Sequence, residues 1–217
     1  MKKLRLKFSK TGDLVYISHL DLMRCMSRAF VRARIPIYHT EGFNPHPYMV
    51  FSPPISLGYT GLEELLEIQV PDEWTPQEVQ SRLNAVLPGG LKMLDAYEPQ
   101  TKLSDVRFAM YRAAFSPALP PDVCGRLEEF LKKPEILVMK KGKKGLREVN
   151  IAPMVRSASL EDCRLLTLIL DCSDAGSLNP ELLLRAAWDT GLCGENEPPA
   201  VSYTRECFLD GEMKNFR

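Results

Sequence analysis

Apolar and polar residues along the chain recur in patterns that predict short strands and amphipathic helices. Residues 2–8 alternate as in a half-buried strand, and turn formers at residues 11–13 separate them from a helix that begins after Ser18. With 3.6 residues per turn, this helix has one apolar face and a basic face on another side. The apolar positions are Leu22, Met26, Ala29, Phe30 and Ala33, and the basic positions are Arg24, Arg28 and Arg32.

The same analysis divides the chain into two halves with one order of elements. The first half continues with extended segments at 35–39, 48–51 and 64–70, a helix at 75–87 and a strand at 91–97. The second half is expected to have strands at 106–115, 135–139, 160–171 and 200–209, with helices at 121–132 and 180–188. Strand, helix, two strands, helix, strand is the order of ferredoxin-like domains. We therefore predict an α+β protein of two tandem ferredoxin-like (βαββαβ) domains, residues 1–100 and 104–217.

The composition suits one large core or two small ones, since 45% of the 217 residues are hydrophobic. The longest apolar runs are far shorter than the roughly 20 residues that a membrane span needs. No apolar segment follows the basic start of the chain, so we expect a cytoplasmic protein with no membrane contact. The six cysteines show no C-x-x-C spacing, and we expect all of them to be reduced thiols.

The formal net charge is zero, but the charges are unevenly distributed. Basic residues outnumber acidic ones in 1–50 and 104–157, and acidic residues outnumber basic ones in 51–103 and 158–217. Folding could gather the two basic segments on one face, where they would bind a polyanion. The alternative is a set of solvated surfaces that neutralise one another.

The residues that could carry chemistry are concentrated between positions 16 and 64. All three histidines of the chain lie there, together with several carboxylates and a loop rich in Gly, Asn and Pro. The candidate binding residues are His19, His39, Glu41, Asn44, His46 and Glu64. Their spacing matches no metal-binding motif, so we predict neither a metal nor a cofactor. Two interpretations stay open: hydrogen bonding across a loop, or proton transfer by His19 as a general acid or base.

We expect His19, Arg24, Asn44 and His46 to line one pocket. The start of the helix and the 42–47 loop are both short and should fold over the same end of the sheet. The N–H groups at the helix N-terminus would make such a pocket attractive to an anion.

A second basic feature lies at residues 140–147, between two extended segments. Its lysines are Lys140, Lys141, Lys143 and Lys144. A flexible cationic tip of this kind binds phosphates without reading sequence. Alternatively, the lysines only keep strand edges apart. Joint RNA contact by this tip and the arginine-bearing helix requires both to face the same way.

Two strings of residues resemble a known family. They are residues 17–24, ISHLDLMR, and residues 40–47, TEGFNPHP, followed by Phe51, Pro54, Gly58 and Glu64. The chain resembles the bacterial radical-SAM-associated (radical SAM-linked) proteins over essentially its whole length. Members of that family have no known function. Where they show an Asp-Ile-Arg-Pro-like motif, this chain has Asn150-Ile151-Ala152-Pro153.

The resemblance implies a radical SAM protein as partner, because members are encoded beside such a protein or fused to it. Their genes also tend to lie near those of an RNA-processing ribonuclease and of ribosomal proteins, which implies a link to RNA. This chain has no CxxxCxxC motif for an iron–sulfur cluster, so it would be the accessory protein.

Three functions follow as hypotheses. The first is an accessory protein that binds RNA, or presents an RNA-linked substrate, to a radical SAM enzyme. The second is a metal-independent endoribonuclease that uses His19, as in CRISPR repeat-processing enzymes, which also have tandem ferredoxin-like domains. Their glycine-rich loop near the C-terminus is missing from this sequence. The third is a protein-interaction module without a ligand.

Overall fold

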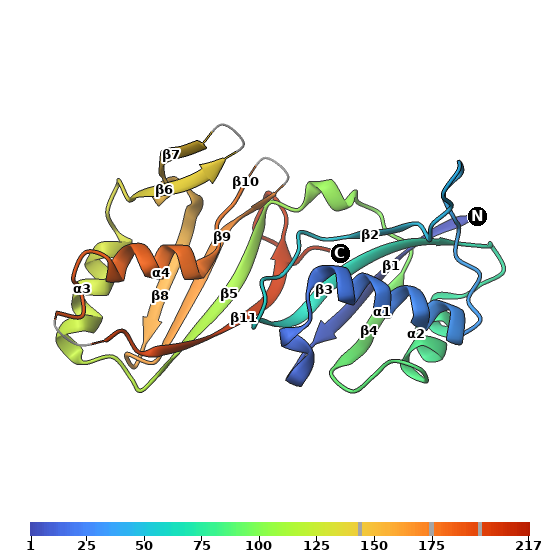
Figure 1. Ribbon diagram of the computed structural model, residues 1–217, viewed down its shortest axis with the longest axis horizontal. Helices are drawn as coiled ribbons and strands as arrows, with labels where there is room; N and C mark the ends of the chain where they lie inside the picture. Colours follow the sequence, from blue (N-terminus) through green and yellow to red (C-terminus); the bar gives the residue numbers. More distant parts are fainter. Residues whose placement is uncertain (143–144, 174–175, 195–196) are drawn as a thin grey trace.

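A single mixed sheet runs through both halves of the molecule (Figure 1). The computed structural model describes residues 1–142, 145–173, 176–194 and 197–217. Within these residues the sheet has nine strands, in the order β10-β9-β5-β11-β3-β1-β4, with β2 paired to β3 and β8 paired to β9. The strands are β1 (Lys2–Lys10), β2 (Met49–Phe51), β3 (Thr60–Val70), β4 (Leu91–Tyr97), β5 (Phe108–Ser116), β8 (Val155–Glu161), β9 (Leu165–Ser173), β10 (Gly176–Ser177) and β11 (Ala200–Leu209).

Four helices pack against this sheet: α1 (His19–Arg32), α2 (Pro76–Asn84), α3 (Pro121–Leu131) and α4 (Pro180–Trp188). Short 3-10 turns, η1 (Gly12–Tyr16), η2 (Leu103–Asp105) and η3 (Ala152–Met154), lie in the connections. Helices α1 and α2 each begin directly after an N-cap residue. The side chains of Ser18 and Thr75 accept hydrogen bonds from the backbone N–H groups of Asp21 and Glu78.

The first half has its own core, between one face of β1, β3 and β4 and the helices α1 and α2. Every second residue of β1 is buried there, as the alternation predicts: Leu4, Leu6 and Phe8. Helix α1 buries the predicted apolar face against them, and Arg24, Arg28 and Arg32 are exposed. The amphipathic pattern of this helix is therefore confirmed.

The second half has a separate core beneath α3 and α4. Strand β9 contributes Leu166, Leu168, Leu170 and Cys172, which alternate as in a sheet with one covered face. The expected single strand at 160–171 is wrong. Asp162 and Cys163 have φ of 49° and 52°, so the chain turns there and β8 folds back antiparallel on β9.

The expected strand at 135–139 also differs from the structure. Strand β6 (Leu137–Gly142) does not join the main sheet but pairs with β7 (Gly145–Asn150) in a separate two-stranded sheet. Leu137, Met139 and Leu146 of this hairpin are exposed. The strand thus begins two residues later than expected, and the hairpin forms its own backbone hydrogen bonds away from the main sheet.

Taken together, the protein is α+β with a large, mostly antiparallel sheet. The two halves meet where β11 pairs in parallel with β3, through Thr204 opposite Thr60 and Arg205 opposite Gly61. In the second half, β11 also pairs antiparallel with β5. Strand β11 is therefore the element through which the sheet continues from one half to the other.

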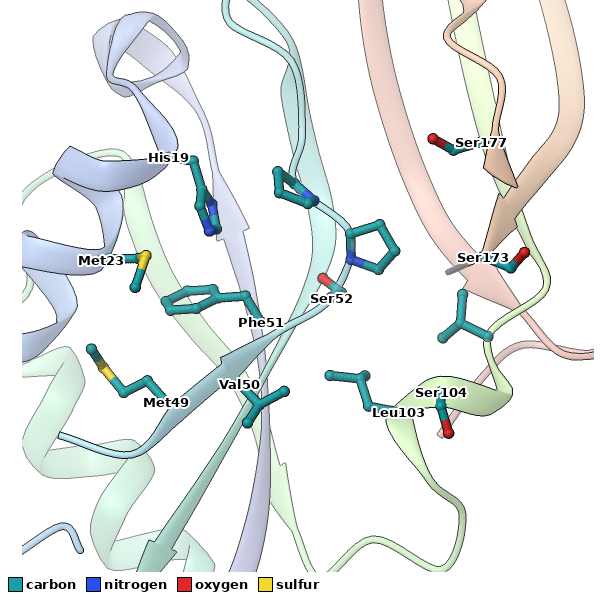
Figure 2. A pocket seen from close by; sticks show the side chains of 13 residues that line it. His19, Met23, Met49, Val50, Phe51, Ser52, Leu103, Ser104, Ser173 and Ser177 are labelled. Atoms are coloured by element: carbon teal, nitrogen blue, oxygen red, sulfur yellow. The ribbon is translucent and has the colours of Figure 1, made fainter. Parts of the chain in front are cut away.

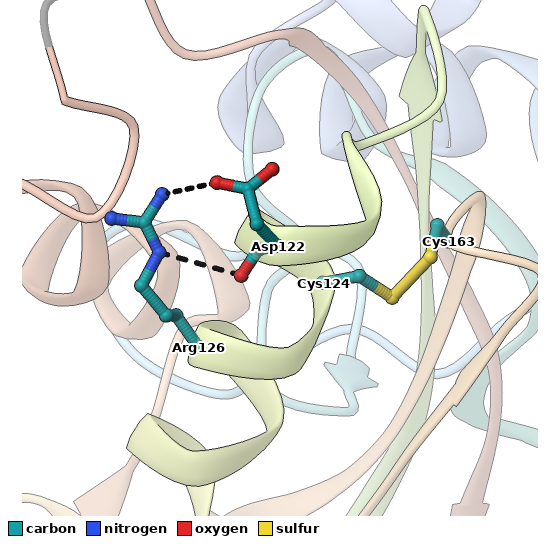
Figure 3. Close-up of a disulfide and its surroundings, with 4 residues drawn as sticks. All are labelled: Asp122, Cys124, Arg126 and Cys163. Atoms are coloured by element: carbon teal, nitrogen blue, oxygen red, sulfur yellow. Dashed lines mark hydrogen bonds and ion pairs between the residues drawn. A yellow bond between two sulfur atoms is a disulfide. The ribbon is translucent and has the colours of Figure 1, made fainter.

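The expectation that all cysteines are reduced thiols is wrong for two of them. Cys124 at the start of α3 and Cys163 in the turn between β8 and β9 form a disulfide (Figure 3). They are 39 residues apart, and only the packing of α3 beside this turn brings their Cα atoms to 5.6 Å. Cys25, Cys172, Cys193 and Cys207 are free. Of the helices that the structure describes, none has the length and apolar character that crossing a membrane requires.

Candidate functional site

A cavity of about 630 Å³ lies between the two halves of the molecule (Figure 2). Helix α1 and β2 form one wall, and η2 with the ends of β9 and β10 forms the other. Its lining residues are His19, Met23, Met49, Val50, Phe51, Ser52, Pro53, Pro54, Leu103, Ser104, Val106, Ser173 and Ser177. Among these residues His19 has the only titratable side chain, and none carries a permanent charge.

His19 is the first residue of α1, directly after the capping Ser18. The helix thus carries the imidazole to the edge of the cavity, where it packs edge-on against Phe51 with ring centres 5.2 Å apart. Partial burial lowers the pKa of His19 below its usual 6.5; the Glu64 carboxylate opposes this shift and Lys10 adds to it. The imidazole is therefore mainly neutral near pH 7.

Behind the cavity, Glu64 of β3 and Arg205 of β11 form a buried ion pair between the halves. Nε of Arg205 donates to Oε1 of Glu64 at 2.8 Å, and Nη2 donates to the other carboxylate oxygen and to the carbonyl of Pro53. The two side chains are 5% exposed or less. Lys10, also buried, donates to the carbonyl of Val15 at 3.1 Å.

The sequence analysis identified only one residue of the Glu64–Arg205 ion pair. Glu64 was a candidate, but Arg205 was not, because 141 residues separate them. One signal was available. Arg205 follows Val201 and Tyr203 at every second position of a predicted strand, so it falls on the face that packs inward. A charge at such a position indicates a buried partner.

A smaller cavity of about 150 Å³ adjoins Arg205 and is lined by residues of both halves. Tyr111 and Cys172 line it, and burial raises the pKa of Tyr111 to about 12. At its rim the hydroxyl of Tyr59 donates to Oδ1 of Asn179 at 2.6 Å. The hydroxyls of Tyr59 and Tyr111 therefore stay protonated near neutral pH, and they serve as polar packing around the Glu64–Arg205 ion pair.

The basic face of α1 borders a second large hollow, of about 590 Å³. It is lined by Asp21, Arg24, Cys25, Arg28, Arg32 and Pro88. Arg24 pairs with Asp21 at 3.0 Å, and Arg32 donates to the carbonyl of Val86. Within the part of the chain that the structure describes, Arg28 has no ion-pair partner. The three guanidinium groups therefore keep an exposed positive surface.

The expected pocket of His19, Arg24, Asn44 and His46 is wrong. His19 and Arg24 line different hollows on two sides of α1, and neither lining includes Asn44 or His46. The 40–46 loop follows Tyr38, whose backbone N–H donates to the carbonyl of Gln69, near the end of β3. His19 instead packs on Phe51, which pairs with Leu66, farther back along β3.

The remaining loop candidates are separate from His19. His39, Glu41 and Asn44 are exposed, and His46 shares hydrogen bonds with Thr40 and the carbonyl of Asn44 within its own loop. The described residues contain no group of three or more His, Cys, Asp or Glu side chains with a geometry suited to a metal ion.

Two lysines of the second basic feature, Lys140 and Lys141, are described by the structure. They belong to β6, and the β6–β7 hairpin lies on the second half, away from α1 in the first half (Figure 1). Lys143 and Lys144 lie outside the described residues. Partial burial and, to a smaller extent, the nearby Arg147 guanidinium lower the pKa of Lys140. Within the part of the chain that the structure describes, helix α1 and strand β6 therefore belong to different halves of the molecule.

Comparison with known proteins gives a family but no activity. No curated protein matches the chain. Among solved structures, the chain is similar to the crystal structure of an unknown protein from Galdieria sulphuraria, at 9% identity over 94% of this chain and 98% of that one, with a TM-score of 0.30. A TM-score this low carries no inference. The model of a family described as "Uncharacterized protein conserved in bacteria (DUF2344)" matches residues 3–180, and the chain therefore belongs to this bacterial family.

Proposed function

We propose that this protein is an RNA-binding accessory of a radical SAM enzyme. The observation that carries the proposal is the exposed arginine face of α1 beside a large surface hollow. Arg24, Arg28 and Arg32 are four residues apart, so they follow one side of the helix at intervals of about 6 Å. Guanidinium groups hydrogen-bond phosphate in bidentate fashion, which suits a nucleic-acid backbone.

Binding is favoured over RNA cleavage by the composition of the central cavity. His19 is its only titratable lining residue among those that the structure describes, and the neighbouring carboxylate, Glu64, is held by Arg205. An acid–base mechanism needs groups that give and take protons in the same place. A neutral imidazole in an apolar wall is more suited to contacting a ligand.

The partner and the architecture belong to the same proposal. The radical SAM protein is proposed from the resemblance in residues 17–24 and 40–47, and a cytoplasmic location goes with it. We also propose that residues 1–100 and 104–217 are two ferredoxin-like domains. In support, the strand order β4-β1-β3-β2 of the first half matches the order β11-β5-β9-β8 of the second half. The match holds when each half is numbered from its own first strand and when β10 and the separate β6–β7 hairpin are left out.

The test replaces Arg24, Arg28 and Arg32 with glutamate and measures binding of a fluorescein-labelled single-stranded RNA by anisotropy. We expect the wild-type protein to bind more weakly as salt rises. The triple variant should bind more weakly at low salt, and the slope of log affinity against log salt should fall by about 2, since each phosphate contact contributes roughly 0.7.

The matched control replaces Arg126, Arg164 and Arg185 with glutamate; these arginines are also exposed but lie in the second half. This variant has the same change in net charge and should keep most of the affinity. Equal loss in both triple variants would mean that only net charge matters, and no RNA binding by the wild type at low salt would remove the proposal.

A further inference from the structure

We propose that the cavity between the two halves receives one unpaired nucleobase, with the attached phosphates outside it near the basic side chains at its margins. This inference rests on the proposed RNA binding and deepens it, because it assigns the cavity a ligand class that the basic face alone does not require.

The lining has the chemistry of a site for an uncharged ring. Met23, Met49 and Phe51 with His19 form one wall, and Leu103 and Val106 belong to the other (Figure 2). Four serines, Ser52, Ser104, Ser173 and Ser177, add hydroxyls that both donate and accept hydrogen bonds. A volume of about 630 Å³ lies in the usual range for small-ligand sites.

The outer edge of β2 adds backbone groups to this chemistry. Ser52 donates its backbone N–H to the carbonyl of Leu65 in β3, so alternate residues of the strand point toward β3. The N–H and C=O groups of Met49 and Phe51 therefore point away from β3, and no other described strand pairs with β2. Met49 and Phe51 both line the cavity, so these groups are placed to pair with the polar edge of a base.

The charges around the cavity complement a nucleotide, because no lining residue among those that the structure describes carries a permanent charge, whereas cations lie at the margins. Met23 lines the cavity, and the next residue, Arg24, begins the basic face. On the opposite wall, Lys102 and Arg107 flank η2, and these two exposed cations outnumber its one exposed carboxylate, Asp105. A protein side chain in the cavity would have no need of these cations, whereas the phosphates attached to a base would.

The experiment uses methionine methyl groups as reporters, with the full-length protein labelled at methionine methyl carbons. Titration with adenosine, an uncharged nucleoside, should shift the methyl signals of Met23 and Met49. Met139, exposed on the distant β6–β7 hairpin, should not respond. Signals are assigned by single Met→Leu changes.

A variant whose cavity is filled by a large side chain tests the same site. Ser104→Trp, at an exposed position on η2, should abolish the adenosine shifts and weaken RNA binding about tenfold, a typical loss for one stacked base. Its salt slope should equal that of the wild type. Ser202→Trp, exposed on β11 and outside the cavity lining, should behave as the wild type. An unchanged Met139 signal shows that each variant is folded.

The outcomes separate this inference from the proposed function. One outcome is that an RNA with abasic positions binds as tightly as the intact RNA and that adenosine shifts no methyl signal. This outcome would overturn the base site and leave the RNA proposal standing. Adenosine shifts without RNA binding would do the reverse. Methyl shifts with N-acetylphenylalanine amide but not with adenosine would replace the base by a protein side chain and overturn the inference.

Discussion

At the scale of single residues, His19 differs from the other two histidines because the fold carries it to an interior edge. Phe51 packs on its ring, and partial burial disfavours the imidazolium. A charged form would gain from Glu64, but Arg205 already holds that carboxylate and Lys10 lies close by. The neutral form of His19 is therefore part of the folded structure.

This leads to a prediction on pH dependence. The pKa of His19 is below 6.5 in the folded protein and returns to about 6.5 on unfolding, so the unfolded chain takes up the proton first as pH falls. The titration of His19 therefore leaves the free energy of unfolding unchanged above about pH 6.5. It lowers that free energy as the pH falls from there through the pKa of the folded state. Urea unfolding of His19→Gln should show a smaller loss between about pH 7 and about pH 5 than the wild type. Parallel curves for the two proteins would contradict the assignment.

At the scale of elements, α1 joins the two proposed binding features. Its N-terminus carries His19 to the cavity, and its exposed face carries the arginines. The position of both depends on how firmly the first turn is held. Ser18 does this by accepting from the N–H of Asp21 at 3.1 Å and donating to its carboxylate at 2.7 Å.

We predict that Ser18→Ala destabilises the protein by about 1 kcal/mol, as the loss of an N-cap usually does. It should also weaken adenosine binding, because the first turn of α1 frays and His19 is no longer fixed. Thr75→Ala removes the equivalent cap of α2 and should cost a similar amount without any effect on adenosine. Urea unfolding and methyl titration check both; a loss of adenosine binding in Thr75→Ala would indicate a general effect of stability.

At the scale of the whole molecule, the halves are joined by strand pairing and by a buried charge pair. Strand β11 continues the sheet onto β3, and Arg205 meets Glu64 across that junction. Removing one partner of a buried pair leaves the other charge uncompensated, which costs more than the pair contributes. The junction is therefore the place where one substitution affects both halves.

We predict that Glu64→Gln destabilises the protein by roughly 3–5 kcal/mol and separates the unfolding of the two halves. Trp74 and Trp188, the only tryptophans, lie in different halves, so Trp74→Phe and Trp188→Phe backgrounds report each half by fluorescence. The two urea transitions should coincide in the parent protein and diverge after the substitution. Glu63→Gln, whose Lys7 partner is 2.6 Å away at a less buried site, should cost about 1 kcal/mol or less. Coincident transitions in Glu64→Gln would show that strand pairing alone couples the halves.

The local elements of this protein follow from sequence because their causes are local. The strand at 91–97, the helix at 180–188 and the strand at 200–209 have the predicted bounds, and α1 has the predicted cap and apolar face. Alternation, helical periodicity, caps and helix-stopping residues act within a few positions of the chain. The errors arose where a turn used left-handed residues without glycine, at Asp162 and Cys163, and where a hairpin left the main sheet.

The candidate site was decided by contacts between distant segments. The sequence analysis grouped His19 with His46 because they are close in sequence. In the structure, Phe51 beside His19 pairs with Leu66 of β3, whereas Tyr38 before the loop of His46 bonds to Gln69 of the same strand. The cavity, the Glu64–Arg205 pair and the Cys124–Cys163 disulfide each join segments from separate parts of the chain. Periodicity determines which face of an element is buried; only the packing of the two halves determines what that face meets, since contact energies depend on tertiary neighbours.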